Sequence, residues 1–145
     1  MFVLEFKVEA KLQQYQAIDD AIRAAQFIRN KCLRYWMDNK GVNKYDLSAY
    51  CRVLAHDFKF AGQLNSQARQ ASAEKAWSSI SRFFDNCKQK VIGKKGYPRF
   101  KKFSRSVEYK TTGWKLINPK TIHFSDQKGI GTLKLKGTWD LGYFQ

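Results

Sequence analysis

The sequence predicts an α+β fold in which three helices are inserted into a small antiparallel β-barrel or wedge. Residues 2–9 alternate apolar and polar side chains, as in a half-buried strand, and residues 107–136 carry several short strand patterns separated by turns. Residues 12–91 between them show apolar positions spaced three and four apart, which indicates helices. We expect the first strand to join the later ones, with three segments: a first wedge strand at 1–10, a helical, helix-turn-helix-like recognition domain at 11–92, and a basic loop with the remaining strands of an incomplete barrel at 93–145.

The first helix is predicted from about Leu12 to Asn39, where Gly41 can end it in a left-handed conformation. A second helix is predicted from Asp46, a favourable N-cap, to Phe58. Gly62 then breaks the chain, and a third helix follows with Asn65 or Ser66 as its cap. An apolar stripe on this helix predicts core packing against the first helix: Ala73, Trp77, Ile80, Phe84, Cys87 and Val91. The opposite face is free to meet a ligand: Arg69, Gln70, Lys75, Arg82 and Lys88.

The last part of the chain predicts an antiparallel meander. Strand patterns cover residues 107–110, 113–117, 121–124 and 131–136, with an Asn118-Pro119 turn between the second and third.

The chain has 27 Lys and Arg against 12 Asp and Glu, a formal net charge of +15 on 145 residues. Such an imbalance costs self-repulsion, and a polyanionic partner is the simplest reason for it. No apolar run reaches the ~20 residues that span a bilayer, and the N-terminus lacks a signal-peptide pattern, so we expect no membrane partner. Cys32, Cys51 and Cys87 are odd in number and widely spaced, which favours reduced thiols packed as small hydrophobes in a cytoplasmic protein.

Residues 93–105 interleave cations and aromatics on a backbone broken by Gly93, Gly96 and Pro98. No acidic residue lies between Asp85 and Glu108. Cations attract phosphates and release condensed counterions, and aromatic rings offer faces on which bases stack. The alternative is a solvated basic loop whose aromatics pack into the core. The candidate nucleic-acid-binding residues here are Lys94, Lys95, Tyr97, Arg99, Lys101, Lys102, Arg105 and, farther on, Lys110.

The start of the third helix carries Asn, Ser and Gln side chains that suit the reading of base edges, since Asn and Gln can bond adenine in a bidentate manner. Ser66, Arg69 and Gln70 are the candidates. A polar, solvated first turn is the equal alternative.

Little in the chain predicts catalysis or a cofactor. Asp19 and Asp20 are adjacent on the first helix and point to different faces, so they do not form a ready metal pair. The other acids are scattered, whereas two-metal phosphodiester cleavage needs converging carboxylates. Cys and His lack the short spacing of a zinc site. We expect no metal, no cofactor and no catalysis by this chain alone.

Several segments resemble the N-terminal portion of the TnpB (OrfB) proteins of insertion sequences, which are transposon-encoded RNA-guided DNA endonucleases related to type V CRISPR effectors. The most specific match is Gly96-Tyr97-Pro98-Arg99-Phe100-Lys101 with the lysines on either side. Other matching segments are Phe27-Ile28-Arg29-Asn30, Ala76-Trp77 through Phe83-Phe84, Ser106-Val107-Glu108-Tyr109, and Gly129-Ile130-Gly131 with Leu133-Lys134-Leu135.

The resemblance implies a wedge-like β-barrel interrupted by a helical recognition domain, with guide RNA and target DNA as partners. It also implies reading of a short transposon-adjacent motif near Gln70, with Ser66 and Arg69 beside it. Family members continue into a RuvC-like nuclease with three metal-binding carboxylates and a zinc ribbon, and this chain ends before either. We therefore expect the nuclease portion to be missing by truncation or to be a separate partner chain.

Two other interpretations stay open at this point. One is a free-standing DNA-binding regulator or transposition accessory protein that acts on duplex DNA without RNA. The other is a structural RNA-binding protein with no role on DNA.

Overall fold

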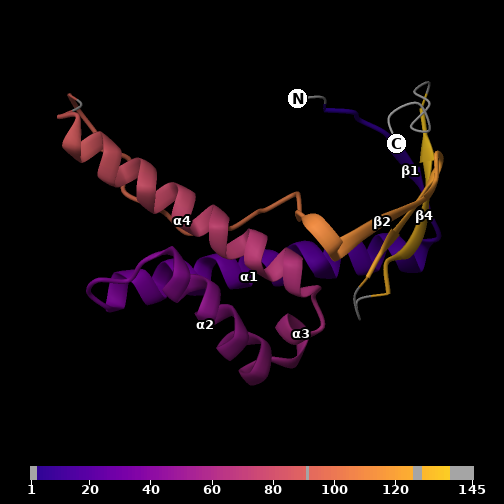
Figure 1. Ribbon diagram of the computed structural model, residues 1–145, viewed down its shortest axis with the longest axis horizontal. Helices are drawn as coiled ribbons and strands as arrows, with labels where there is room; N and C mark the ends of the chain where they lie inside the picture. The colour runs from indigo at the N-terminus through magenta and orange to yellow at the C-terminus, as the bar shows by residue number, and fades with distance from the viewer. Residues whose placement is uncertain (1–2, 91, 126–128, 138–145) are drawn as a thin grey trace.

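The computed structural model describes residues 3–90, 92–125 and 129–137. Over these residues the chain is α+β, with four α-helices and a four-stranded antiparallel sheet that stands at one end of α1 (Figure 1). The helices are α1 (Leu12–Asp38), α2 (Lys44–Asp57), the short α3 (Lys59–Gly62) and α4 (Ser66–Lys88). A 3-10 turn, η1 (Thr111–Gly113), leads into the sheet. The strands are β1 (Lys7–Glu9), β2 (Trp114–Asn118), β3 (Thr121–Phe124) and β4 (Gly131–Lys136).

The first strand joins the strands that follow the helices, as the sequence predicts. The sheet order is β1-β4-β3-β2, and Val8 lies opposite Leu135 in the β1–β4 pair. The side chain of Gln14 fastens α1 to this sheet, because its Nε2 donates to the carbonyls of Ile130 and Thr132, at 2.8 Å each. The helices are therefore an insertion between the first strand and the rest of its sheet.

The α+β class and the antiparallel pairing are confirmed, but the described strands do not close into a barrel: the sheet is open, and its edge strands β1 and β2 do not pair with each other. Closing a sheet into a barrel requires enough tilted, staggered strands to come full circle. Four strands of three to six residues do not provide this. Residues 138–145, assigned to the wedge from sequence, lie outside the described part of the chain.

The number of helices also differs from the three predicted, because α3 forms a fourth between α2 and α4. It has only four residues, too few for an apolar period to show in sequence. Gly62 ends it rather than simply breaking the chain. A Cβ on Gly62 would stand 2.5 Å from the carbonyl oxygen of Ala55, so the glycine allows α3 to fold tightly back against α2.

The second helix begins at Lys44, and its N-cap is Asn43 rather than the predicted Asp46. The Asn43 Oδ1 accepts from the N–H groups of Tyr45 and Asp46, while the Asp46 carboxylate accepts from the Asn43 N–H at 2.9 Å. This is a reciprocal capping box, in which Asp46 takes the third helical position. Of the two caps predicted for the last helix, Asn65 is the right one: it caps α4 and accepts from Gln67 N–H, and Ser66 is the first helical residue.

Two predicted strands are shorter than expected or missing. The alternation at the N-terminus persists in burial from residue 3 onward, yet only Lys7–Glu9 form a strand, because β4 pairs with these three residues alone. Residues 107–110 are extended without strand pairing, since they run along α4 instead of beside another strand. A strand needs a neighbour to satisfy its backbone, and alternation alone does not supply one.

The helical core depends on small side chains that let α1 and α4 approach closely. Four fully buried alanines come from these two helices: Ala21, Ala24, Ala68 and Ala76. Ile28 and Leu33 of α1 and Ile80 of α4 fill the space around them. Dense packing of this kind leaves little room for larger side chains.

The apolar stripe predicted on α4 is core only in its first half. Ala73 and Ile80 are buried, whereas Phe84 and Cys87 are exposed, because the C-terminal end of α4 projects past the other helices (Figure 1). Cys87 is therefore not the small core hydrophobe expected from sequence, although Cys32 and Cys51 are. Val91, the last position of the stripe, lies outside the described residues.

We predict that Leu33→Ala lowers the free energy of unfolding by about 2–5 kcal/mol, because it leaves a cavity at a fully buried position. Leu12→Ala is the matched control on the same helix. Leu12 is 71% exposed, so its loss is expected to stay within about 0.5 kcal/mol. Urea denaturation followed by circular dichroism measures both, and equal losses would contradict the assigned core.

Candidate nucleic-acid interface

The basic loop forms a return segment, residues 92–110, that leaves the end of α4 and runs back alongside this helix (Figure 1). The reversal uses left-handed backbone at Gly93 (φ +91°) and Gly96 (φ +74°). Glycine adopts this conformation without the steric cost of a Cβ. The segment then continues to η1 and the sheet without regular secondary structure.

Side chains of α1 hold the backbone of the return segment in place. Asn30 makes two hydrogen bonds to the backbone of Lys101: its Nδ2 donates to the Lys101 carbonyl at 2.8 Å, and its Oδ1 accepts from the Lys101 N–H at 2.9 Å. Gln26 Oε1 accepts from Ser104 N–H at 2.8 Å. Arg29 Nη1 donates to the Arg99 carbonyl at 3.1 Å. These bonds supply the partners that an irregular backbone needs when it packs on a helix.

Near its start the segment is held by α4 and by aromatic packing. Asn86 Nδ2 donates to the Lys95 carbonyl at 3.0 Å. The Tyr97 ring lies edge-on to Phe83, with ring centres 5.1 Å apart, and 5.8 Å from Trp36. Tyr97 is nonetheless 53% exposed, so one ring both anchors the segment and meets solvent.

Two hollows lie between α1, α4 and the return segment. The inner hollow, of about 490 Å³, is bounded by residues 101–108 of the segment, and the outer hollow, of about 890 Å³, by residues 94–101. They share four lining residues, so they form one continuous basic groove: Arg29, Ser79, Arg82 and Lys101. The groove runs along α4 from Ser72 to Phe83, which at 1.5 Å per residue is about 16 Å.

Positive charge dominates the groove. The cations that line the two hollows together are Arg29, Lys75, Arg82, Lys94, Lys95, Arg99, Lys101 and Arg105. Among the described lining residues, Glu108 is the sole acid, and it belongs to the inner hollow. Glu74 on the nearby turn of α4 is already ion-paired with Lys110. The groove therefore has the charge of a site for a polyanion.

Arg29 is the most buried cation of the groove, at 8% exposure. Its guanidinium donates to neutral oxygens, at Asn30 Oδ1, the Arg99 carbonyl and Ser79 Oγ. Burial lowers the pKa of Arg29, and no carboxylate in the described chain forms an ion pair with it. Three of its five N–H donors bond to described residues, and the other two have no partner among them.

Serine hydroxyls also line the inner hollow. Those of Ser72, Ser78 and Ser79 donate to carbonyls one turn back on α4, at 2.9–3.4 Å. Ser104 and Ser106 come from the return segment and add hydroxyls on the opposite wall. Hydroxyls beside cations suit the oxygens of a phosphate group.

The structure gathers most of the predicted loop residues in one place. Lys94, Lys95, Tyr97, Arg99 and Lys101 line the outer hollow, and Lys101 and Arg105 line the inner one. Lys102 is exposed next to them without lining either hollow. Lys110 lies apart, in its ion pair with Glu74.

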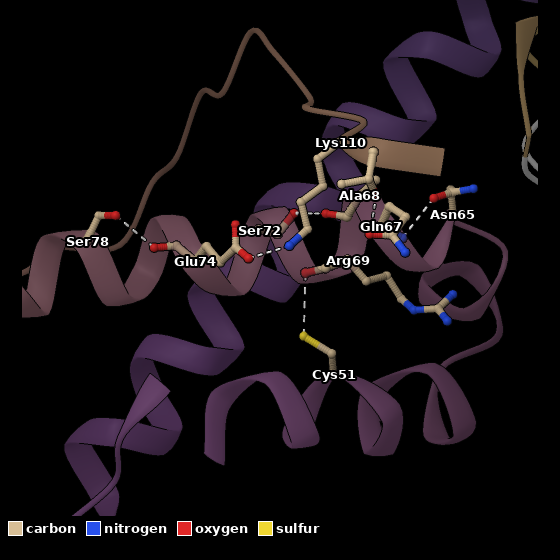
Figure 2. Close-up of polar contacts among 10 residues, drawn as sticks. Cys51, Asn65, Gln67, Ala68, Arg69, Ser72, Glu74, Ser78 and Lys110 are labelled. Atoms are coloured by element: carbon tan, nitrogen blue, oxygen red, sulfur yellow. Dashed lines mark hydrogen bonds and ion pairs between the residues drawn. The ribbon is translucent and has the colours of Figure 1, made fainter. Parts of the chain in front are cut away.

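The residues predicted at the start of α4 do not line either hollow. Figure 2 shows one of them, Arg69, above Cys51 of α2. Ser66 is exposed and Gln70 is half-buried. Arg69 donates to the carbonyls of Gly62 and Leu64, and burial lowers the pKa of its guanidinium. Its backbone carbonyl also accepts from the Cys51 thiol. Arg69 thus holds the α3–α4 turn in this structure.

Two neighbours of this cluster connect α4 to the sheet. The Asn65 Nδ2 donates to the Ser125 carbonyl, and Gln67 Oε1 accepts from the Thr111 hydroxyl at 2.8 Å. The first turn of α4 is therefore partly structural, contrary to a purely solvated turn.

Reasoning from sequence missed Arg29 as a member of the site. It lies among core positions of a helix, where a basic residue is uncommon, and this oddity was the available signal. Lys75 and Arg82 were recognised as a free polar face, but only the fold brings them opposite the return segment.

No group of three or more His, Cys, Asp or Glu side chains suited to a metal ion occurs within the described ranges. Likewise, none of the helices described has both the length and the apolar character needed to cross a bilayer. No protein-family model matches this sequence, and no curated protein matches it.

We predict that Asn30→Ala speeds amide hydrogen exchange at Lys101 by about 2- to 10-fold, since a hydrogen bond contributes about 0.5–1.5 kcal/mol. Ser104, bonded to Gln26, is the internal reference and should keep its protection. Gln16→Ala, at an exposed position on the same helix, is the control variant. Unchanged exchange at Lys101 would show that Asn30 does not hold the segment.

Proposed function

We propose that this chain is the nucleic-acid-binding N-terminal part of a TnpB-like RNA-guided DNA endonuclease of an insertion sequence. In this proposal it grips guide RNA and target DNA and reads a short transposon-adjacent motif. The cutting chemistry belongs to a RuvC-like nuclease portion, on a longer form of the protein or on a separate chain. No catalytic step is assigned to these residues.

The basic groove is the observation that supports binding most directly. Among the residues that the structure describes, eight cations and one acid, Glu108, line this continuous depression. The groove is about 16 Å long, so it can contact several consecutive phosphates of one strand. Neutralising them releases counterions, and binding of this kind weakens steeply as salt rises.

The chain's architecture is compatible with the resemblance. A helical insertion between the first strand and its sheet is the arrangement that the resemblance implies for the wedge and recognition domains. Residues 94–101, which contain the most specific matching segment, form the wall of the outer hollow. Sequence selection would then come mainly from base pairing with the guide, and the protein would supply backbone contacts.

Motif reading is proposed for the start of α4. Arg69 is bonded to the α3–α4 turn, so we assign base contact to Gln70 and Ser66 and a positioning role to Arg69. A glutamine amide can donate to and accept from an adenine edge together.

Copurification and binding assays separate this proposal from its two alternatives. A TnpB-like part should retain a discrete structured RNA and bind duplex DNA only weakly in its absence. Tight protection of a defined duplex without RNA would instead favour a free-standing DNA-binding regulator. Binding to RNA that is indifferent to added target DNA would favour a structural RNA-binding protein.

We predict that replacing Lys94, Lys95, Lys101 and Lys102 together with alanine weakens RNA binding. It should also flatten the slope of log K against log salt by up to about one unit per lost phosphate contact. Fluorescence anisotropy over a salt series measures both quantities.

A charge-matched control replaces four exposed lysines outside the groove with alanine: Lys40, Lys44, Lys59 and Lys120. Both variants lose four positive charges, so only position distinguishes them. Equal effects would attribute binding to net charge alone, and an unchanged groove variant would remove the return segment from the interface.

We predict that Gln70→Ala relaxes preference for the adjacent motif by about 1–3 kcal/mol per contacted base pair, with little effect on RNA affinity. Competition between duplexes that differ only in the motif measures the preference. Gln63→Ala, on the α3–α4 turn, is the control. A loss confined to RNA binding would place Gln70 on the RNA scaffold.

A further inference from the structure

Among the described aromatic residues, Phe103 has the most exposed side chain, at 91%. It lies at the rim of the inner hollow. An aromatic ring left almost wholly in water loses the benefit of burial, and such positions mark surfaces that meet a partner. Tyr97 and Phe100 of the same segment are far less exposed, at 53% and 43%.

The backbone is held on both sides of this ring. Lys101, two residues before it, is bonded twice to Asn30, and Ser104, the next residue, donates to Gln26. The two anchors on α1 lie one turn apart, at positions 26 and 30. Phe103 is therefore presented at a determined place on the molecule, and little ordering is needed when a ligand meets it.

Donors for a phosphate lie in the hollow that Phe103 borders. Arg82 and Arg105 line this hollow at exposed positions, and Arg29 lies at its floor with two N–H donors that have no partner among the described residues. Of the described residues in the lining, Glu108 alone carries a carboxylate. A stacking ring next to phosphate donors is the combination used to bind single strands.

We infer that the inner hollow and Phe103 form a subsite for an unpaired nucleotide. The base stacks on the Phe103 ring while the adjoining phosphate enters the hollow toward Arg29, Arg82 and Arg105. This inference rests on the proposed function and narrows it. In a duplex the faces of the bases are covered by their neighbours, so the ring selects single-stranded over double-stranded nucleic acid.

The test compares a 12-nucleotide single-stranded oligouridine with a 12-base-pair duplex, both fluorescently labelled, at low salt. The unaltered chain should bind the single strand more tightly. Phe103→Ala should weaken single-strand binding by about 5- to 150-fold, which corresponds to the 1–3 kcal/mol of one stacked base, and leave duplex binding unchanged. Phe103→Trp keeps an aromatic face at this position and should therefore keep the preference for the single strand over the duplex.

Tyr45→Ala is the matched control, because Tyr45 is an aromatic on α2 that is 72% exposed and lies outside the groove. An abasic oligonucleotide of the same length should bind the unaltered chain and Phe103→Ala equally. Single-strand affinity unchanged in Phe103→Ala overturns the subsite while leaving groove binding intact. Absence of binding to every nucleic acid tested would instead overturn the proposed function.

Discussion

The return segment owes its path to hydrogen bonds that side chains of α1 make to its backbone. Gln26, Arg29 and Asn30 bond to main-chain groups between Arg99 and Ser104. Because the partners are backbone atoms, the side chains of residues 99–104 are not needed for these bonds; elsewhere in the segment Tyr97 and Tyr109 pack against other aromatic rings. Residues 99–103 can therefore all be basic or aromatic, and these side chains are left for the solvent face and for a ligand.

This arrangement concentrates charge at a cost. Glu74 is engaged by Lys110, Arg29 has only neutral partners, and the groove keeps one carboxylate among eight cations. Like charges brought together destabilise the compact state. A bound polyanion would remove this repulsion, so binding and folding are thermodynamically linked, and a chain that holds its ligand gains stability from it.

Local periodicity was sufficient to predict the range of the longest helix and of two strands. Leu12–Asp38, Thr121–Phe124 and Gly131–Lys136 agree with their predicted ranges, and the pairing of the first strand with the later sheet followed from the order of elements. The misses have physical causes. Asn43 and Asp46 are both residue types that cap helices. In the structure Asn43 is the N-cap of α2, and Asp46 is the third helical residue of the same capping box.

The groove itself could not be predicted, because it joins residues far apart in the chain. Arg29 and Arg99 are 70 positions apart, and sequence spacing says nothing of such a contact. The exposed half of α4 was missed for a related reason: periodicity shows which face is apolar, whereas the extent of the neighbouring helices decides how far it is covered.

The three cysteines differ in whether a reagent in solution can reach the thiol. Cys32 and Cys51 are buried, at 0% and 3% exposure, so reagents in solution do not reach them; the neighbouring Cys51 thiol and burial also raise the pKa of the Cys32 thiol. Cys87 is exposed on the last turn of α4, next to Asn86, which holds the start of the return segment. A maleimide dye would thus attach at one native position, at the outer mouth of the groove, without mutagenesis. The fold carries its own attachment point for optical distance measurements to a labelled oligonucleotide.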